Sequence, residues 1–107
     1  IKEWRTDLVL GDTCGAGYQL RPHIVWFGED VPMIEKAAAI CETADILVII
    51  GTSMQVYPAA SLMHYITKNT PIYFIDPNPN IISRQNLTVI DTIATDGVTK
   101  FIALLTA

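Results

Sequence analysis

The clearest indication of the fold comes from the stretch of residues 46–53, Ile46-Leu47-Val48-Ile49-Ile50-Gly51-Thr52-Ser53. Its first five residues form an unbroken aliphatic and mostly β-branched run, which is typical of a strand buried on both faces of a parallel sheet. The run stops at Gly51-Thr52-Ser53, because small and hydroxyl-bearing residues favour a turn. The sequence therefore predicts a buried strand that ends in a turn of small residues.

Helical and extended patterns alternate on both sides of this run. Pro32 is well placed to open a helix, because its missing N–H would lack a partner at that position anyway. Helices are expected over residues 32–43, 58–68 and 97–105, and strands over residues 24–27, 46–50, 72–75 and 88–90. This alternation predicts an α/β fold, namely a partial Rossmann-like, doubly wound parallel sheet with helices on both faces.

The composition excludes several classes of function. The net charge is −4 and the seven Lys and Arg residues are scattered, so no basic patch is available for direct nucleic-acid binding. No apolar run approaches the roughly 20 residues that a membrane span requires. Two cysteines, Cys14 and Cys41, are too few for a disulfide framework, so we expect a cytoplasmic location.

Two longer motifs narrow the function. Residues 20–29 read LRPHIVWFGE, and residues 51–60 read GTSMQVYPAA. These resemble two signature blocks of the sirtuins of bacterial type, the NAD-dependent protein-lysine deacylases, in which LRP-x-V-V-x-FGE precedes GTS-x-x-V-x-P-A. A strand that ends in Ile75-Asp76 follows in the same order as in the family. The resemblance covers most of the chain.

The resemblance also implies a division of the chain and a missing metal. Residues 1–19 would be the remnant of a small zinc-module region or connector, and residues 20–107 the carboxyl-terminal part of a Rossmann-like NAD-binding domain. Most sirtuins hold zinc on two CxxC pairs, of which only Cys14 remains here. Because structural zinc almost always needs four ligands, we expect the zinc to be lost and assign no metal ligand.

NAD is the cofactor that the resemblance implies. Ligands of open α/β sheets bind beyond the carboxyl ends of the strands, although the same small and polar residues also serve as ordinary turns. Asp76 stands where the family usually has an asparagine that reaches the adenosine ribose, and its charge beside an anionic cofactor is expected to weaken affinity. The residues that the resemblance assigns to NAD are Gly51, Thr52, Ser53, Asp76, Pro77, Asn78, Ala94, Gly97 and Val98.

An acyl-lysine peptide or protein is the substrate that the resemblance implies. The peptide would add as a strand between two segments of the chain, pairing through its main chain. Val25 and Phe27 are expected to help line the tunnel for the acyl-lysine. The substrate-binding residues would be Val25, Phe27, Gly28 and Glu29 on one edge and Val56, Tyr57 and Pro58 on the other.

The implied reaction is acyl transfer from lysine to the ADP-ribose of NAD, with release of nicotinamide. No catalytic residue is assigned, because the family's catalytic histidine and glycine-rich phosphate loop lie upstream of these motifs. His23 and His64 are expected to be structural or solvent-facing instead. We therefore expect an inactive portion of a deacylase, completed by an amino-terminal half of the same protein and prone to self-association through its exposed sheet surface.

Two alternatives stay open at this point. The chain could be a non-catalytic module that binds NAD or ADP-ribose, in which case ligand binding would occur without peptide binding. It could also be a structural α/β domain that uses neither motif. The preferred acyl group and the protein substrates cannot be deduced from these residues.

Overall fold

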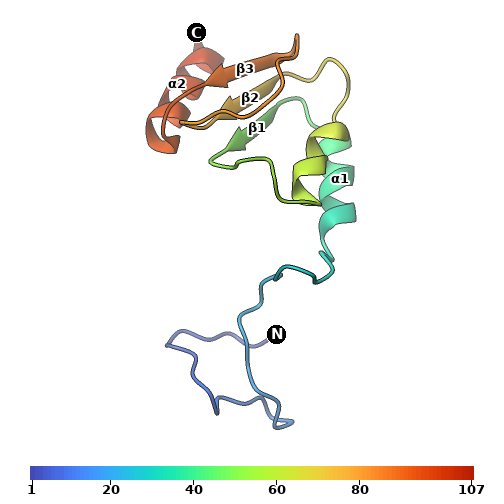
Figure 1. Cartoon of the computed structure of the whole chain (residues 1–107), viewed down its shortest axis with the longest axis vertical. Helices are drawn as coiled ribbons and strands as arrows, with labels where there is room; N and C mark the ends of the chain where they lie inside the picture. The colour runs from blue at the N-terminus through green and yellow to red at the C-terminus, as the bar shows by residue number, and fades with distance from the viewer. The chain divides into compact units, whose positions relative to one another are not determined.

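The computed structural model describes residues 1–107 and divides into two compact units, Ile1–Val31 and Pro32–Ala107. Every helix and strand lies in the second unit, whereas the first consists of turns, loops and one isolated bridge (Figure 1). The division predicted after residue 19 separates a zinc-module remnant from an NAD-binding domain. It does not refer to the boundary between compact units after Val31, and it stays a prediction.

A three-stranded parallel sheet forms the centre of the second unit. Its strands are β1 (Leu47–Ile50), β2 (Ile72–Ile75) and β3 (Leu87–Ile90), in the spatial order β1-β2-β3. Both pairings are parallel, as the alternation of helices and strands predicted. The predicted α/β class with a partial Rossmann-like parallel sheet is therefore confirmed.

The core of this unit lies on the central strand. Ile72, Phe74 and Ile75 of β2 are 0% exposed, and each buried side chain of this size contributes about 1.5–3 kcal/mol. β1 pairs with β2 on one side only, and Ile50 at its end is 43% exposed. The prediction that β1 is buried on both faces is wrong, because Leu47–Ile49 are only half-buried and Ile50 is exposed.

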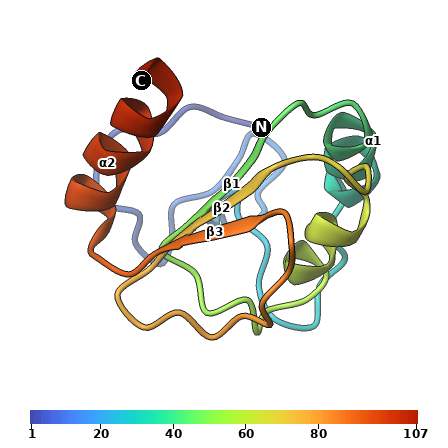
Figure 2. The ribbon, with the colours of Figure 1, turned by 90° about the horizontal axis from the view of Figure 1, so that it is seen from above.

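Three helices accompany the sheet. They are α1 (Ile34–Glu42), the 3-10 helix η1 (Ala59–His64) and α2 (Ala94–Thr106). α1 contacts η1, and α2 packs against β2 and β3; Figure 2 shows α2 and the α1–η1 pair on either side of the strands. None of these helices has the length and apolar character that crossing a membrane requires.

Two helices differ from their predicted extent. The second is a short 3-10 helix rather than a regular α-helix, and Ser61 closes its first turn by donating from both its N–H and its hydroxyl to the Pro58 carbonyl. α2 begins at Ala94, three residues before the predicted start of this helix at residue 97. Gly97 is buried there, and an added Cβ would overlap Cγ2 of Ile75. Only glycine permits this approach of helix and strand.

A buried threonine ties together the amino ends of the strands. Thr70, which is 4% exposed, donates from Oγ1 to the Ala44 carbonyl at 3.3 Å and shares a 2.6 Å hydrogen bond with Oγ1 of Thr67. Asn86 Nδ2 donates to the Thr70 carbonyl at 2.6 Å. Because Ala44 precedes β1, Thr70 precedes β2 and Asn86 precedes β3, the network fixes where each strand starts.

The first unit is built on a turn. Thr13 and Gln19 form an isolated antiparallel bridge, and Cys14 N–H donates to the Tyr18 carbonyl at 2.9 Å. The strand predicted over residues 24–27 is absent, and these residues are exposed loop. That prediction is wrong because a strand needs a neighbour to accept its backbone hydrogen bonds, and this unit contains no strand.

Candidate functional site

The carboxyl ends of the strands lie side by side. The register pairs Ile50 with Ile75 and Ile75 with Ile90, so each residue that follows a strand emerges at the same edge. Gly51 N–H donates to the Ile75 carbonyl at 2.9 Å, and Asp76 N–H donates to the Ile90 carbonyl at 3.3 Å. This edge is where open α/β sheets bind ligands.

The turn after β1 has an unusual backbone. Gly51 has φ +61° and Met54 has φ 56°, so both lie in the left-handed region, which costs a non-glycine residue about 1–2 kcal/mol. Met54 N–H donates to Oγ1 of Thr52 at 3.2 Å, which stabilises the turn. Nothing lies within 4 Å of a Cβ built at Gly51, so a ligand could approach its backbone closely. Ser53 is exposed beside it.

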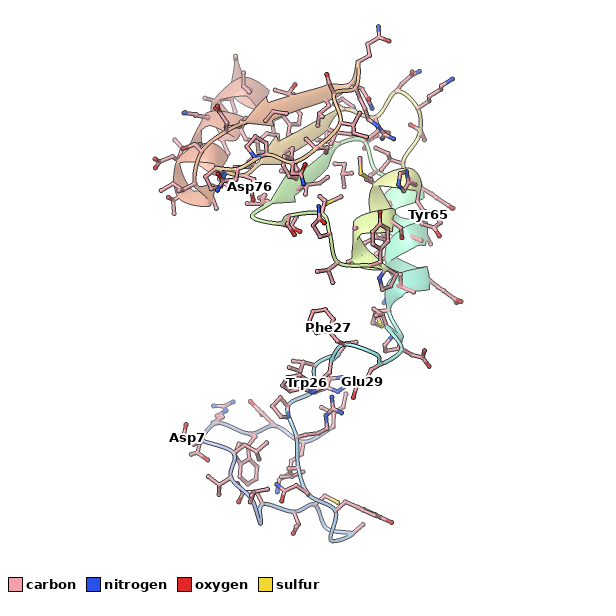
Figure 3. All side chains as sticks on the ribbon, in the orientation of Figure 1. Asp7, Trp26, Phe27, Glu29, Tyr65 and Asp76 are labelled. Carbon is pink, nitrogen blue, oxygen red and sulfur yellow. The ribbon has the colours of Figure 1, made fainter.

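Asp76 closes a second turn at the same edge. Its Oδ1 accepts a hydrogen bond from Asn78 N–H at 2.8 Å, which is the geometry of an Asx turn. Figure 3 labels Asp76 at the end of β2, where it is half-buried, while Pro77 and Asn78 are exposed. The carboxylate keeps Oδ2 free to accept a hydrogen bond from a ligand hydroxyl.

The remaining residues assigned to the cofactor lie on α2, and they differ in accessibility. Ala94 is exposed at the first position of the helix, and Val98 is half-buried. Gly97 is packed against Ile75 and allows α2 to approach β2 closely. Asp91 directly follows β3 and is exposed at the same edge, although it was not among the predicted residues. Its position after an apolar strand was a signal available in the sequence.

The motif over residues 20–29 forms a loop that one ion pair closes. Arg21 donates from Nη1 to Oε1 of Glu29 at 2.6 Å and from Nη2 to Oε2 at 3.0 Å. Nη2 also donates to the Ile24 carbonyl at 3.1 Å, and Glu29 Oε2 accepts from Trp26 N–H at 3.1 Å. The hydrogen bond from Arg21 and then that from Trp26 lower the pKa of Glu29 to about 2. The same pairing raises the pKa of Arg21.

This loop presents an aromatic side chain to solvent. Phe27 is 93% exposed, and Figure 3 shows it on the opposite side of the loop backbone from Glu29. Gly28 follows with φ +83°, a conformation that glycine adopts without strain. Val25 is also exposed. Four predicted substrate residues therefore share one ordered loop.

The other predicted substrate residues belong to the second unit. Val56 and Tyr57 are exposed and Pro58 is half-buried, directly before η1. They follow the turn after β1 and thus lie on the same connection as Gly51 and Ser53. A single groove between these residues and the loop over 20–29 stays a prediction.

The residues present do not fit a structural zinc. No group of three or more His, Cys, Asp or Glu side chains lies close enough to hold a metal ion. Cys14 and Cys41 are both free, and backbone hydrogen bonds, first from Ala16 and then from Tyr18, lower the pKa of the Cys14 thiol. His23 and His64 are exposed on different units.

Comparison with known proteins identifies the family. The model of the Sir2 family matches residues 3–58, about half of the chain, including the loop over 20–29 and the turn after β1. The chain belongs to the Sir2 family. Similar curated proteins carry the name NAD-dependent protein deacylase. That of Bacteroides thetaiotaomicron is 46% identical over 106 residues, 98% of this chain and 45% of its own length.

Two further relatives with this name support the assignment. That of Helicobacter pylori strain J99 is 51% identical over 77 residues, 72% of this chain and 33% of its own length. That of Aggregatibacter actinomycetemcomitans is 51% identical over 74 residues, 69% of this chain and 36% of its own length. This Sir2-family chain thus spans less than half the length of the curated relatives it matches, and the predicted sirtuin resemblance is confirmed.

Proposed function

We propose that this Sir2-family chain is a portion of an NAD-dependent protein-lysine deacylase. The whole protein would transfer an acyl group from lysine to the ADP-ribose of NAD and release nicotinamide. The observation that carries the proposal is the shared edge formed by Gly51 and Asp76. It lies in a chain of which 98% aligns, at 46% identity, with an NAD-dependent protein deacylase. NAD supplies the ribose carbon that receives the acyl oxygen.

The chain's own residues would bind and orient the cofactor. The open backbone at Gly51 and the hydroxyls of Thr52 and Ser53 suit the ribose and phosphate portion, because donors and small residues allow close approach. Asp76 Oδ2 would accept a hydrogen bond from an adenosine ribose hydroxyl. The wall around adenosine and adenine would be formed by Pro77, Asn78, Ala94, Gly97 and Val98. Gly97 would contribute by bringing α2 close to β2.

An extended acyl-lysine peptide would be the substrate. The exposed loop at Phe27–Glu29 and the connection at Val56–Pro58, of which Val56 and Tyr57 are exposed, offer backbone groups for strand addition. The Arg21–Glu29 pair would hold the loop in one conformation before the peptide arrives, which reduces the entropic cost of binding.

A further part of the same protein would complete the enzyme. β1 has one unpaired edge and an exposed Ile50, which supports continuation of the sheet beyond the described strands. The catalytic base would come from that part, because the family's catalytic histidine lies upstream of these motifs. Within the second unit, His64 lies at the opposite end of the strands from Gly51 and Asp76. The proposal thus includes an inactive isolated chain, lost zinc and a cytoplasmic location, the last supported by two free cysteines.

The test is an assay of the intact protein with NAD and an acetyl-lysine peptide. Mass spectrometry should detect nicotinamide, deacetylated peptide and acetyl-ADP-ribose in equal amounts. Gly51→Ala should weaken NAD binding at least tenfold, because φ +61° is unfavourable for alanine at this edge. Gly11→Ala, at φ +101° in the first unit, is the matched control and should leave binding unchanged.

Other outcomes would contradict specific parts of the proposal. ADP-ribose binding by the intact protein without any deacetylation would favour the non-catalytic module. Equal loss of NAD affinity in both glycine variants would remove the edge at Gly51 as the cofactor site. Product formation by residues 1–107 alone would show that the catalytic base lies within this chain.

A further inference from the structure

A hollow of about 400 Å³ lies at the amino ends of the strands, opposite to the edge at Gly51 and Asp76. One wall is formed by residues 63, 64 and 66–68, at the end of η1 and in the segment that follows, and the other by Arg84–Asn86 before β3. Figure 2 shows the segment before β3 beside η1. We refer to this hollow as the basic groove. A four-residue strand spans about 13 Å, so the basic groove is separate from the candidate cofactor site.

The charge of the basic groove is one-sided. His64 and Lys68 lie on the first wall and Arg84 on the second, and none of the lining residues is acidic. The ion pairs of the chain are Arg5–Glu3 and Arg21–Glu29, so Lys68 and Arg84 are without an acidic partner. In a chain of net charge −4, two unpaired cations that face one hollow from opposite walls favour an anion there.

The two walls are joined by hydrogen bonds rather than left free to separate. Asn86 Nδ2 donates to the Thr70 carbonyl at 2.6 Å, and Ile72 N–H donates to the Asn86 carbonyl at 2.8 Å. Thr67 shares its hydroxyl with Thr70, and Leu87 N–H donates to the Arg84 carbonyl at 3.2 Å. The backbones that carry the two cations are therefore fixed relative to each other.

These hydrogen bonds also decide which groups remain for a ligand. The Asn86 amide and the Thr67 hydroxyl already bond within the protein. The ammonium of Lys68 and the guanidinium of Arg84 form no ion pair, so both can donate to a ligand in the basic groove. A planar guanidinium and a flexible ammonium together suit phosphate oxygens.

We propose that the basic groove is a binding site for the phosphate groups of a small anionic ligand. Its volume of about 400 Å³ is within the usual range for small-molecule sites. The site does not depend on the proposed deacylase function, because none of its residues belongs to the edge at Gly51 and Asp76.

The test is calorimetric titration of the intact protein with inorganic pyrophosphate. Arg84→Gln and Lys68→Gln should each lower the association constant about tenfold, because each removes a charge-assisted hydrogen bond. Lys36→Gln removes an exposed charge from α1 outside the basic groove and should change affinity less than twofold. Arg84→Lys keeps the charge and should retain more affinity than Arg84→Gln.

A parallel NMR titration with pyrophosphate, followed by amide chemical shifts, locates the site. Signals of Lys68 and Arg84 should move with pyrophosphate, while those of Gly51 and Asp76 should stay. Absence of binding at millimolar pyrophosphate would overturn the proposal, as would an equal loss of affinity in the Lys36→Gln variant. Shifts confined to the edge at Gly51 would assign pyrophosphate to the candidate cofactor site and overturn it too. If the intact protein bound pyrophosphate in the basic groove but did not deacylate an acetyl-lysine peptide, only the proposed function would be contradicted.

Discussion

Arg21 donates two hydrogen bonds, of 2.6 Å and 3.0 Å, to the carboxylate of Glu29, which lies eight positions later in the chain. The pair closes the loop that carries Phe27, which is 93% exposed. Both side chains of the pair remain substantially exposed, at 53% and 40%, so the expected effect is local ordering of the loop rather than global stability.

The ordering of this loop should depend on acid. Glu29 has a pKa of about 2 in the folded chain against an ordinary value of 4.5, so the unfolded loop binds its proton first as pH falls. The stabilising contribution is therefore complete above pH 4.5 and is lost as pH falls through about 2. We expect the fluorescence of Trp26, in a Trp4→Phe background, to report this loss.

The matched control is Glu29→Gln, which cannot titrate at this position. Its loop should already be less ordered at neutral pH, and the Trp26 signal should show no transition between pH 4.5 and 2. An identical acid transition in this variant would show that other groups order the loop.

Phe27→Ala should weaken binding of an acyl-lysine peptide while leaving stability unchanged. Truncating an exposed side chain usually changes the free energy of unfolding by less than about 0.5 kcal/mol. Loss of an aromatic anchor should raise the peptide KM at least about fivefold, or about 1 kcal/mol. Tyr18→Ala, which removes another exposed aromatic ring from the same unit, is the control. Equal KM values for both variants would refute a substrate role for Phe27.

Asp76→Asn should tighten NAD binding about two- to fivefold. Asparagine keeps an oxygen that can accept from Asn78 N–H, so the Asx turn is retained. It removes one negative charge from beside an anionic cofactor, which is worth up to about 1 kcal/mol near solvent. Calorimetric titration with NAD measures the change, and the gain should shrink at high salt. In the variant an amide N–H takes the place of Oδ2 and would donate to the ribose hydroxyl instead of accepting from it. Weaker NAD binding would mean that the hydrogen bond accepted by Oδ2 outweighs the charge repulsion.

Gly97→Ala should destabilise the chain although alanine is the better helix former. Helix propensity alone would add about 0.5–1 kcal/mol of stability. The new Cβ overlaps Cγ2 of Ile75, however, and such overpacking costs about 1–3 kcal/mol. Thermal unfolding should show a lower Tm. Gly15→Ala, where nothing lies within 4 Å of the new Cβ, should shift Tm little. A raised Tm for Gly97→Ala would contradict the close contact of α2 and β2.

Thr70→Val should disrupt the amino ends of the strands. The variant keeps the side-chain shape but leaves the Ala44 carbonyl and the Thr67 hydroxyl without their partner, which costs about 1–3 kcal/mol. Urea unfolding measures the loss. Thr70→Ser retains the hydroxyl and should cost clearly less. If serine were as destabilising as valine, packing of the methyl group would be the dominant contribution.

Local sequence patterns located the sheet and much of the candidate site. The apolar runs at 46–50, 72–75 and 88–90 agree with β1, β2 and β3 to within a residue, because short aliphatic runs between turn residues favour strands. Gly51 and Asp76 could be placed at one edge because parallel strands end on the same side. Asp91 follows from the same rule, although the resemblance assigned Ala94, Gly97 and Val98 instead.

Local runs and contiguous motifs were sufficient to predict the three strands of the sheet, their parallel arrangement and membership of the Sir2 family. Only the tertiary structure decided that β2 rather than β1 is the buried centre, that residues 24–27 form a closed loop, and that Lys68 faces the same groove as Arg84. Those properties depend on which distant residues meet. An aliphatic run specifies a strand wherever it lies, but its burial is set by the neighbours that pack on it.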